Sequence, residues 1–121
     1  MTINDQNTQI LYNPQCSKCR QALQLLNDEG IEPEIIEYLK DTPDFTEIEK
    51  ILGMLNIEPR DLMRKGEAIY SELDLDRSEL SRNDLIQAMI DNPRLIERPI
   101  VIKDGKAMIG RPPQNILDII K

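Results

Sequence analysis

The chain has 121 residues, with 15 Lys and Arg against 22 Asp and Glu and a formal net charge of −7. The length suits one domain with one core, and the acidic balance argues against general binding to nucleic acid or to an anionic membrane. The absence of histidine excludes a Ser-His or Cys-His catalytic pair, and two cysteines cannot build a Cys₄ zinc site, so we expect no metal and no bound cofactor.

The N-terminal residues are polar and lack the basic flank and the apolar block of a signal peptide. No run approaches the ~20 apolar residues of a membrane span. We therefore expect a cytoplasmic protein without a membrane partner, in which residues 1–8 are disordered or frayed. In a reducing compartment the two cysteines are expected to be free thiols or a redox pair.

The first elements form a strand–helix–strand pattern. The apolar run Gln9–Tyr12 predicts a strand, apolar residues at helical spacing predict a helix over Ser17–Glu29, and Glu34–Leu39 suits a second strand. The pattern fills about thirty residues, the size of a βαβ unit, so we expect the two strands to be parallel.

The middle of the chain is predicted to be helical. Thr42–Pro43 is typical of a helix cap followed by proline at the first helical position, and Pro59 can begin a short helix. Ser81 and Asp84 have the spacing of a capping box, which predicts a helix that ends at Asn92.

The end of the chain returns to strands. Pro99–Lys103 and Lys106–Ile109 are β-rich and flank Asp104–Gly105, a tight-turn signal, and Pro112–Pro113 precedes a last amphipathic helix. The element order predicts an α/β fold with a mixed four-stranded sheet flanked by helices. We expect a single domain over residues 1–121, with a helical insertion in the middle of the chain.

The segment from Asn13 to Arg20 carries the chemistry. It places Cys16 where a strand ends and a helix begins, and the unpaired N–H groups of a first helical turn favour a thiolate and can hold an oxyanion. Cys19 follows three residues later on the same helix face, so a disulfide can close within one turn. At a βα junction this C-x-x-C spacing indicates a redox motif, although Cys19 also lies on the apolar stripe and can be a packing residue.

Four segments together resemble one family. The segments from Tyr12 to Arg20, Leu62 to Lys65, Glu97 to Val101 and Ile109 to Pro112 are similar, in order and spacing, to those of the ArsC arsenate reductases. These are the glutathione/glutaredoxin-coupled type, and their fold is thioredoxin-like. The resemblance covers roughly residues 9–120.

The resemblance implies that Cys16 is the nucleophile, that Arg64, Arg98 and Arg111 hold the oxyanion, and that the Arg98–Pro99 bond is cis. Guanidinium groups suit this task because they offer planar paired donors and keep their charge. We therefore expect an enzyme that reduces arsenate to arsenite through a covalent Cys16–arsenate intermediate. The remaining arginines, at positions 20, 60, 77, 82 and 94, are expected to be solvated surface residues.

Two positions depart from the family pattern. Tyr12 occupies a position where histidine is common, and Cys19 occupies one that is usually serine or another non-cysteine residue. The thiol that resolves the intermediate is therefore either glutathione with glutaredoxin, or Cys19 with thioredoxin as a further reductant. The alternatives are an Spx-like redox-sensing regulator that binds RNA polymerase, and a general thiol-disulfide oxidoreductase that would not need the arginines. The sequence does not specify the oligomeric state, and we expect a monomer.

Overall fold

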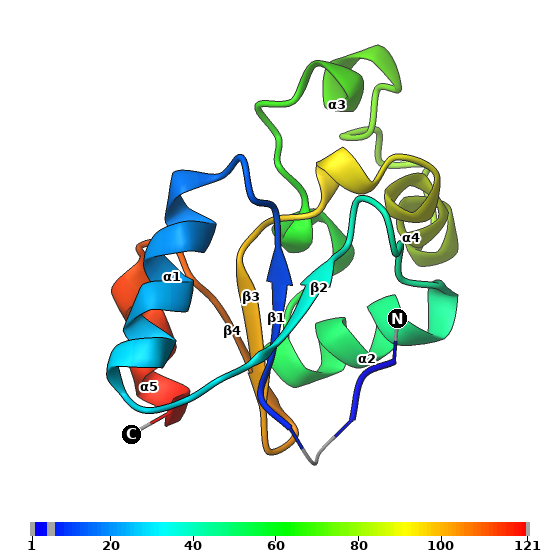
Figure 1. The fold of residues 1–121 in the computed structure, drawn as a ribbon. Coiled ribbons are helices and arrows are strands. Elements are labelled where there is room, and N and C mark those ends of the chain that lie inside the picture. Colours follow the sequence, from blue (N-terminus) through cyan, green and yellow to red (C-terminus); the bar gives the residue numbers. More distant parts are fainter. Residues whose placement is uncertain (1, 5–6, 121) are drawn as a thin grey trace. The chain divides into compact units, whose positions relative to one another are not determined.

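The computed structural model describes residues 2–4 and 7–120 (Figure 1). The chain divides into two compact units, one made of the N-terminal part up to Asp41 and the C-terminal part from Arg98, the other of Thr42–Glu97. The first unit contains the whole sheet, and the second contains helices and turns. The second unit is thus the helical insertion that the sequence predicted.

The first unit is built on a mixed four-stranded sheet. Its strands are β1 (Gln9–Tyr12), β2 (Glu34–Glu37), β3 (Ile100–Lys103) and β4 (Lys106–Ile109), in the order β2-β1-β3-β4 (Figure 1). Strand β1 is parallel to β2 and antiparallel to β3, and β3 is antiparallel to β4. Both the mixed sheet and the parallel first pair are confirmed.

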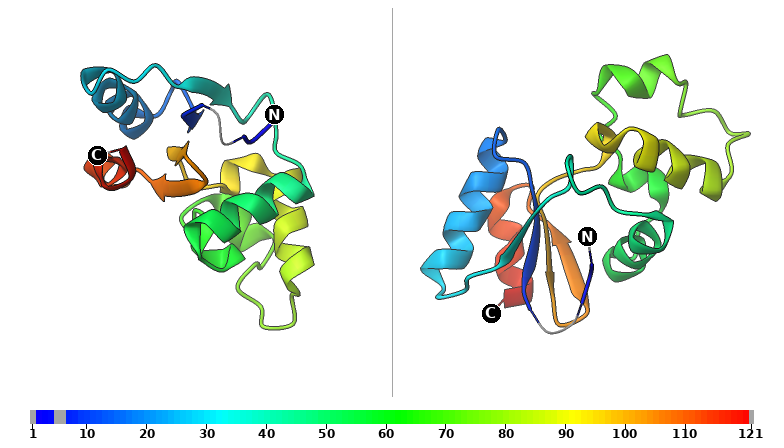
Figure 2. Two further views of the ribbon diagram at one scale, coloured as in Figure 1. Left: turned by 90° about the horizontal axis from the view of Figure 1, so that it is seen from below. Right: turned by 45° about the vertical axis from the view of Figure 1, so that its right-hand side comes forward.

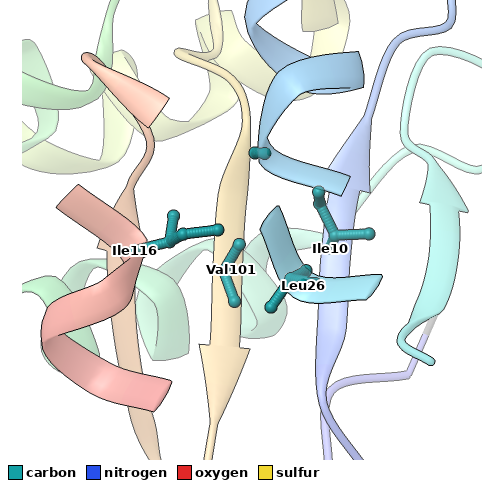
Figure 3. Packing of buried hydrophobic residues seen from close by; sticks show 5 residues of the cluster. Ile10, Leu26, Val101 and Ile116 are labelled. Atoms are coloured by element: carbon teal, nitrogen blue, oxygen red, sulfur yellow. The ribbon is translucent and has the colours of Figure 1, made fainter. Parts of the chain in front are cut away.

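Helix α1 (Ser17–Asp28) connects β1 to β2 and covers one face of the sheet. At the end of the chain, the 3-10 helix η3 (Pro113–Ile116) leads into α5 (Leu117–Ile120), which lies on the same face as α1 (Figures 1 and 2). A buried cluster joins these layers (Figure 3); its members are Ile10, Ala22, Leu26, Val101 and Ile116. Burial of these side chains holds α1 and the C-terminal helical turn η3 against the sheet.

Two turns define the strand ends. Strand β2 stops at Glu37, short of the predicted Leu39, because the N–H groups of Lys40 and Asp41 both donate to the Glu37 carbonyl, each at 2.9 Å. Between β3 and β4, Asp104 and Gly105 have φ of 53° and 76°. Two successive positive φ values are what the predicted two-residue hairpin requires.

In the second unit, α2 (Phe45–Leu55) packs on α4 (Arg82–Asp91). The predicted cap at Thr42–Pro43 is wrong. Asp44 is the N-cap: its side chain accepts a hydrogen bond from Glu47 N at 2.8 Å, and Glu47 accepts one from Asp44 N at 3.1 Å. This reciprocal pair satisfies two N–H groups, which a threonine followed by proline does not do here. The predicted box before α4 is confirmed.

Three further short elements complete this unit. They are the 3-10 turns Pro59–Leu62 and Pro93–Leu95 and the helix α3 (Ala68–Glu72). The sequence analysis missed α3, which has five residues and buries only Tyr70, too little for a periodic apolar signal.

The described residues near the N-terminus contact strand β1. Gln9, which is fully buried, donates to the Thr2 carbonyl at 2.6 Å and accepts from Asn4 N at 3.1 Å. Residues 1, 5 and 6 of the stretch expected to be frayed lie outside the described residues, so that expectation stays a prediction. No helix in the described part of the chain has the length and apolar character needed to cross a membrane.

Two glycines provide a test of the packing. A Cβ on Gly110 would lie 2.8 Å from Pro99 Cγ, whereas a Cβ on Gly53 in α2 would meet nothing within 4 Å. We expect Gly110→Ala to lower the free energy of unfolding by about 1–3 kcal/mol, because the buried contact cannot relax freely. Gly53→Ala should raise it by about 0.5–1 kcal/mol, since alanine loses less backbone entropy in a helix. Urea unfolding of both variants measures the difference, and equal effects would contradict this packing.

Candidate active site

Cys16 is the N-cap residue of α1, with extended backbone angles. Its N–H donates to the Asn13 carbonyl at 2.9 Å, and its carbonyl accepts from Arg20 N at 3.1 Å, the first bond of the helix. The side chain is 7% exposed. The sulfur therefore lies at the positive end of a twelve-residue helix, as the sequence predicted.

The loop before Cys16 is held by its own polar groups. The Asn13 side chain accepts from Gln15 N at 3.0 Å, and Arg20 Nη1 donates to the Pro14 carbonyl at 2.7 Å. Arg20 is exposed, as expected of a solvated surface residue, and it also braces the loop through this hydrogen bond.

Arg111 points its guanidinium at the cysteine. Its Nη2 lies 3.7 Å from Cys16 Sγ, and its Nε donates to the Arg98 carbonyl at 2.8 Å. Asn115 Nδ2 binds the Arg111 carbonyl at 3.1 Å. Two contacts on the side chain and one on the backbone thus fix this arginine beside the sulfur.

Arg98 contributes a donor that the described residues leave open. Its Nε is buried, and no hydrogen-bond partner for it exists in the described part of the chain. A buried N–H of this kind is costly unless an acceptor completes it, so it points to a ligand with oxygen atoms. The Arg98–Pro99 peptide bond is cis, as the resemblance implied, and so is Arg111–Pro112, which was not foreseen.

Cys19, the second cysteine of the C-x-x-C motif, is fully buried. Burial is the main reason why the pKa of its thiol rises from 9.0 to about 12. A backbone hydrogen bond from Asn13 lowers this pKa, a hydrogen bond to Cys16 and the charge of Cys16 raise it, and the Arg111 charge lowers it. At neutral pH Cys19 is therefore a protonated thiol in contact with Cys16.

Arg64 belongs to the second unit and is engaged by acids. Its Nη1 forms an ion pair with Glu67, and its Nε lies 3.6 Å from Glu97 Oε1. The structure thus brings Cys16, Cys19, Arg98 and Arg111 into one part of the first unit, and it places Arg64 among carboxylates in the second unit.

The model of the ArsC family matches residues 11–119. The chain belongs to the ArsC family. It is 44% identical to the arsenate reductase of Neisseria meningitidis serogroup B (strain MC58) over 88% of this chain and 92% of that protein. It is 51% identical to the uncharacterized protein YfgD of Escherichia coli K12, over 92% and 94% of the two chains. The structure of an arsenate reductase from Vibrio cholerae has a TM-score of 0.92 and 44% identity, covering 96% of this chain and 99% of that one.

Membership of the ArsC family, together with that structural match, confirms the predicted thioredoxin-like fold. The departure at Tyr12 has a packing consequence: this partly buried side chain packs against the core cluster. Across the described residues, no three His, Cys, Asp or Glu side chains gather in a way that could hold a metal ion.

The raised pKa of Cys19 predicts a pH dependence of stability. Between pH 9.0 and about 12 the folded protein keeps a proton that the unfolded chain loses, so the free energy of unfolding falls as pH rises through this window. Because other groups also titrate there, we expect the fall to be less steep in Cys19→Ala than in the wild type. Urea unfolding at a series of pH values between roughly 8 and 11 measures both slopes, and parallel curves would contradict the prediction.

Proposed function

We propose that this protein is an arsenate reductase, an oxidoreductase that converts arsenate to arsenite through a covalent intermediate on Cys16. The observation that carries the proposal is the 3.7 Å approach of Arg111 Nη2 to Cys16 Sγ at the N-terminus of α1. One location then offers a sulfur nucleophile, a fixed positive charge and helix N–H groups to a tetrahedral oxyanion. The names of similar proteins support the same substrate.

Binding would use groups that keep their charge at neutral pH. Arg111 holds its guanidinium beside the sulfur, and the unpartnered Nε of Arg98 supplies a buried N–H donor. These donors would offset the repulsion between an anionic substrate and a thiolate. Arg64, in the second unit, is kept as a proposed oxyanion ligand on the strength of its sequence segment.

The first chemical step would be attack of the Cys16 thiolate on arsenic(V). A sulfur–arsenic bond forms, an arsenic–oxygen bond breaks, and the departing hydroxide takes up a proton as water. Arsenic stays pentavalent in this step. The arginines would stabilise the negative charge of the crowded intermediate.

Reduction would occur when a second thiolate attacks the Cys16 sulfur. A disulfide forms, the sulfur–arsenic bond breaks, and its electron pair remains on arsenic, which leaves as arsenite. The second thiol is glutathione, with glutaredoxin restoring Cys16, or Cys19, with thioredoxin as the final reductant. Cytoplasmic thiol reductants would supply the two electrons in either case.

Activity assays with purified protein would test the proposal. We expect arsenite release that is abolished in Cys16→Ser and reduced by orders of magnitude in Arg111→Ala and Arg98→Ala, because attack and charge stabilisation are both lost. Arg94→Ala, which removes an exposed arginine of the second unit, is the matched control and should retain activity. Appreciable turnover in Cys16→Ser would overturn the mechanism.

The same variants separate this function from a general thiol-disulfide oxidoreductase. That activity needs the cysteines and not the arginines, so disulfide reduction that survives Arg98→Ala and Arg111→Ala, without arsenite formation, would favour it. Binding to RNA polymerase without any arsenite formation would favour the regulator.

Cys19→Ser distinguishes the two resolving thiols. Full burial and a pKa raised to about 12 make Cys19 a slow nucleophile at neutral pH, but its contact with Cys16 permits an internal disulfide. Arsenite production is measured with glutathione plus glutaredoxin and with thioredoxin plus its reductase. Activity with glutaredoxin that survives Cys19→Ser means an external thiol. Activity with thioredoxin that is lost in the variant means that Cys19 resolves the intermediate.

A further inference from the structure

Arg64 differs from a simple anion-binding arginine because two carboxylates already hold it. We propose that Glu67 and Glu97 make Arg64 selective for protonated oxyanions, so that the site accepts arsenate and rejects sulfate. This inference rests on the proposed function for the presence of an oxyanion at Arg64. It adds a determinant of specificity that the motif does not reveal.

The backbone brings Glu97 to Arg64. Met63 and Ile96 form an antiparallel bridge, flanked by a hydrogen bond from Arg64 N to the Leu95 carbonyl at 2.7 Å and one from Glu97 N to the Leu62 carbonyl at 2.8 Å. In this register Arg64 and Glu97 are diagonal neighbours, a separation that long side chains can span. The pair is therefore a product of the fold of the second unit.

A tight turn brings the second acid. Glu67 N donates to the Arg64 carbonyl at 3.1 Å, and the Glu67 side chain returns to pair with Arg64 Nη1. Glu67 is the N-cap residue of α3, yet its carboxylate makes no capping hydrogen bond. Its carboxylate is thus committed to Arg64 and not to the helix.

The three charges form a partly exposed group that a small ion can reach. The side chains of Arg64, Glu67 and Glu97 are 27%, 31% and 25% exposed. The carboxylates engage Nη1 and Nε, and neither ion pair uses Nη2. One guanidinium and two carboxylates give a local formal charge of −1, so an arriving oxyanion meets donors and acceptors together.

Carboxylates accept hydrogen bonds but cannot donate them. Near neutral pH arsenate still carries at least one proton, so an As–OH group can donate to Glu67 or Glu97 while its other oxygens accept from Arg64. Sulfate carries no proton at this pH, and its oxygens would face carboxylate oxygens without a bridging hydrogen. This repulsive contact is a device for rejecting the wrong ligand.

Anion binding is best measured without turnover, on the Cys16→Ser protein at neutral pH by isothermal titration calorimetry. Arsenate and phosphate, which both carry protons, are compared with sulfate. We expect Glu67→Gln to tighten sulfate binding by roughly tenfold, because a repulsive oxygen becomes an amide that can donate. Arsenate affinity should change much less, because two effects oppose each other. The variant removes the carboxylate that accepts from the As–OH group, but it also removes the repulsion between that carboxylate and the other arsenate oxygens.

Glu72→Gln is the control, because it removes the same charge from an exposed position on α3. An equal gain in sulfate affinity in Glu72→Gln, or none in Glu67→Gln, would overturn the inference. So would a Cys16→Ser protein with Glu67 intact that fails to prefer arsenate and phosphate over sulfate. When Arg64 is already replaced by Gln, the further change Glu67→Gln should have no effect on sulfate binding. That result would show that the effect of Glu67 on selectivity depends on Arg64.

The outcome is separable from the proposed function. Selective binding that depends on Glu67, in a protein that forms no arsenite with Cys16 intact, would refute the reductase and support the selectivity. Arsenite formation with sulfate binding indifferent to Glu67 and Glu97 would support the reductase and refute the selectivity.

Discussion

The site in the first unit depends on how one guanidinium is anchored. Arg111 follows β4, donates through Nε to the Arg98 carbonyl just before β3, and reaches Cys16 Sγ through Nη2. Because Gly110 N also donates to the Pro99 carbonyl at 2.8 Å, the segments that precede β3 and follow β4 are tied together twice. A small residue is needed at position 110 because Pro99 lies where a side chain would begin. Backbone packing thus sets the distance between positive charge and sulfur.

The two cysteines share one helical turn but have different environments. Cys16 is the N-cap residue, where backbone N–H groups and Arg111 converge, whereas Cys19 faces the interior, and its burial raises the pKa of the thiol to about 12. A protonated thiol in contact with a reactive sulfur does not compete with it for an electrophile. The same contact would leave Cys19 within reach if the Cys16 sulfur became electrophilic, as proposed above. In that two-thiol reduction, burial would set the order in which the two sulfurs react.

Local signals in the sequence predicted local structure well. The Asp104–Gly105 turn, the box at Ser81 and the position of Cys16 at the start of α1 depend on neighbouring residues, and all three are confirmed. The predicted N-cap of α2 was wrong. The proline at position 43 suggested Thr42, whereas reciprocal hydrogen bonds with Glu47 select Asp44. The ion pair between Arg64 and Glu97 lay beyond sequence reasoning, because it depends on a bridge between segments that are far apart in the chain.

A net charge of −7 does not prevent this chain from attracting an anion, because electrostatic fields in salt water are short-ranged. Exposed charges farther away than about 8 Å are largely screened at physiological ionic strength. An anion therefore responds mainly to the charges nearest to it, and the two arginines differ in this respect: Arg111 faces a sulfur, whereas Arg64 is flanked by two carboxylates. Because the charged groups next to the two arginines differ, we expect the two arginines to have different roles. In the functions proposed above, the charge at Arg111 would attract the anion, while Arg64 with Glu67 and Glu97 would favour protonated over unprotonated oxyanions, so attraction and discrimination would fall to different residues.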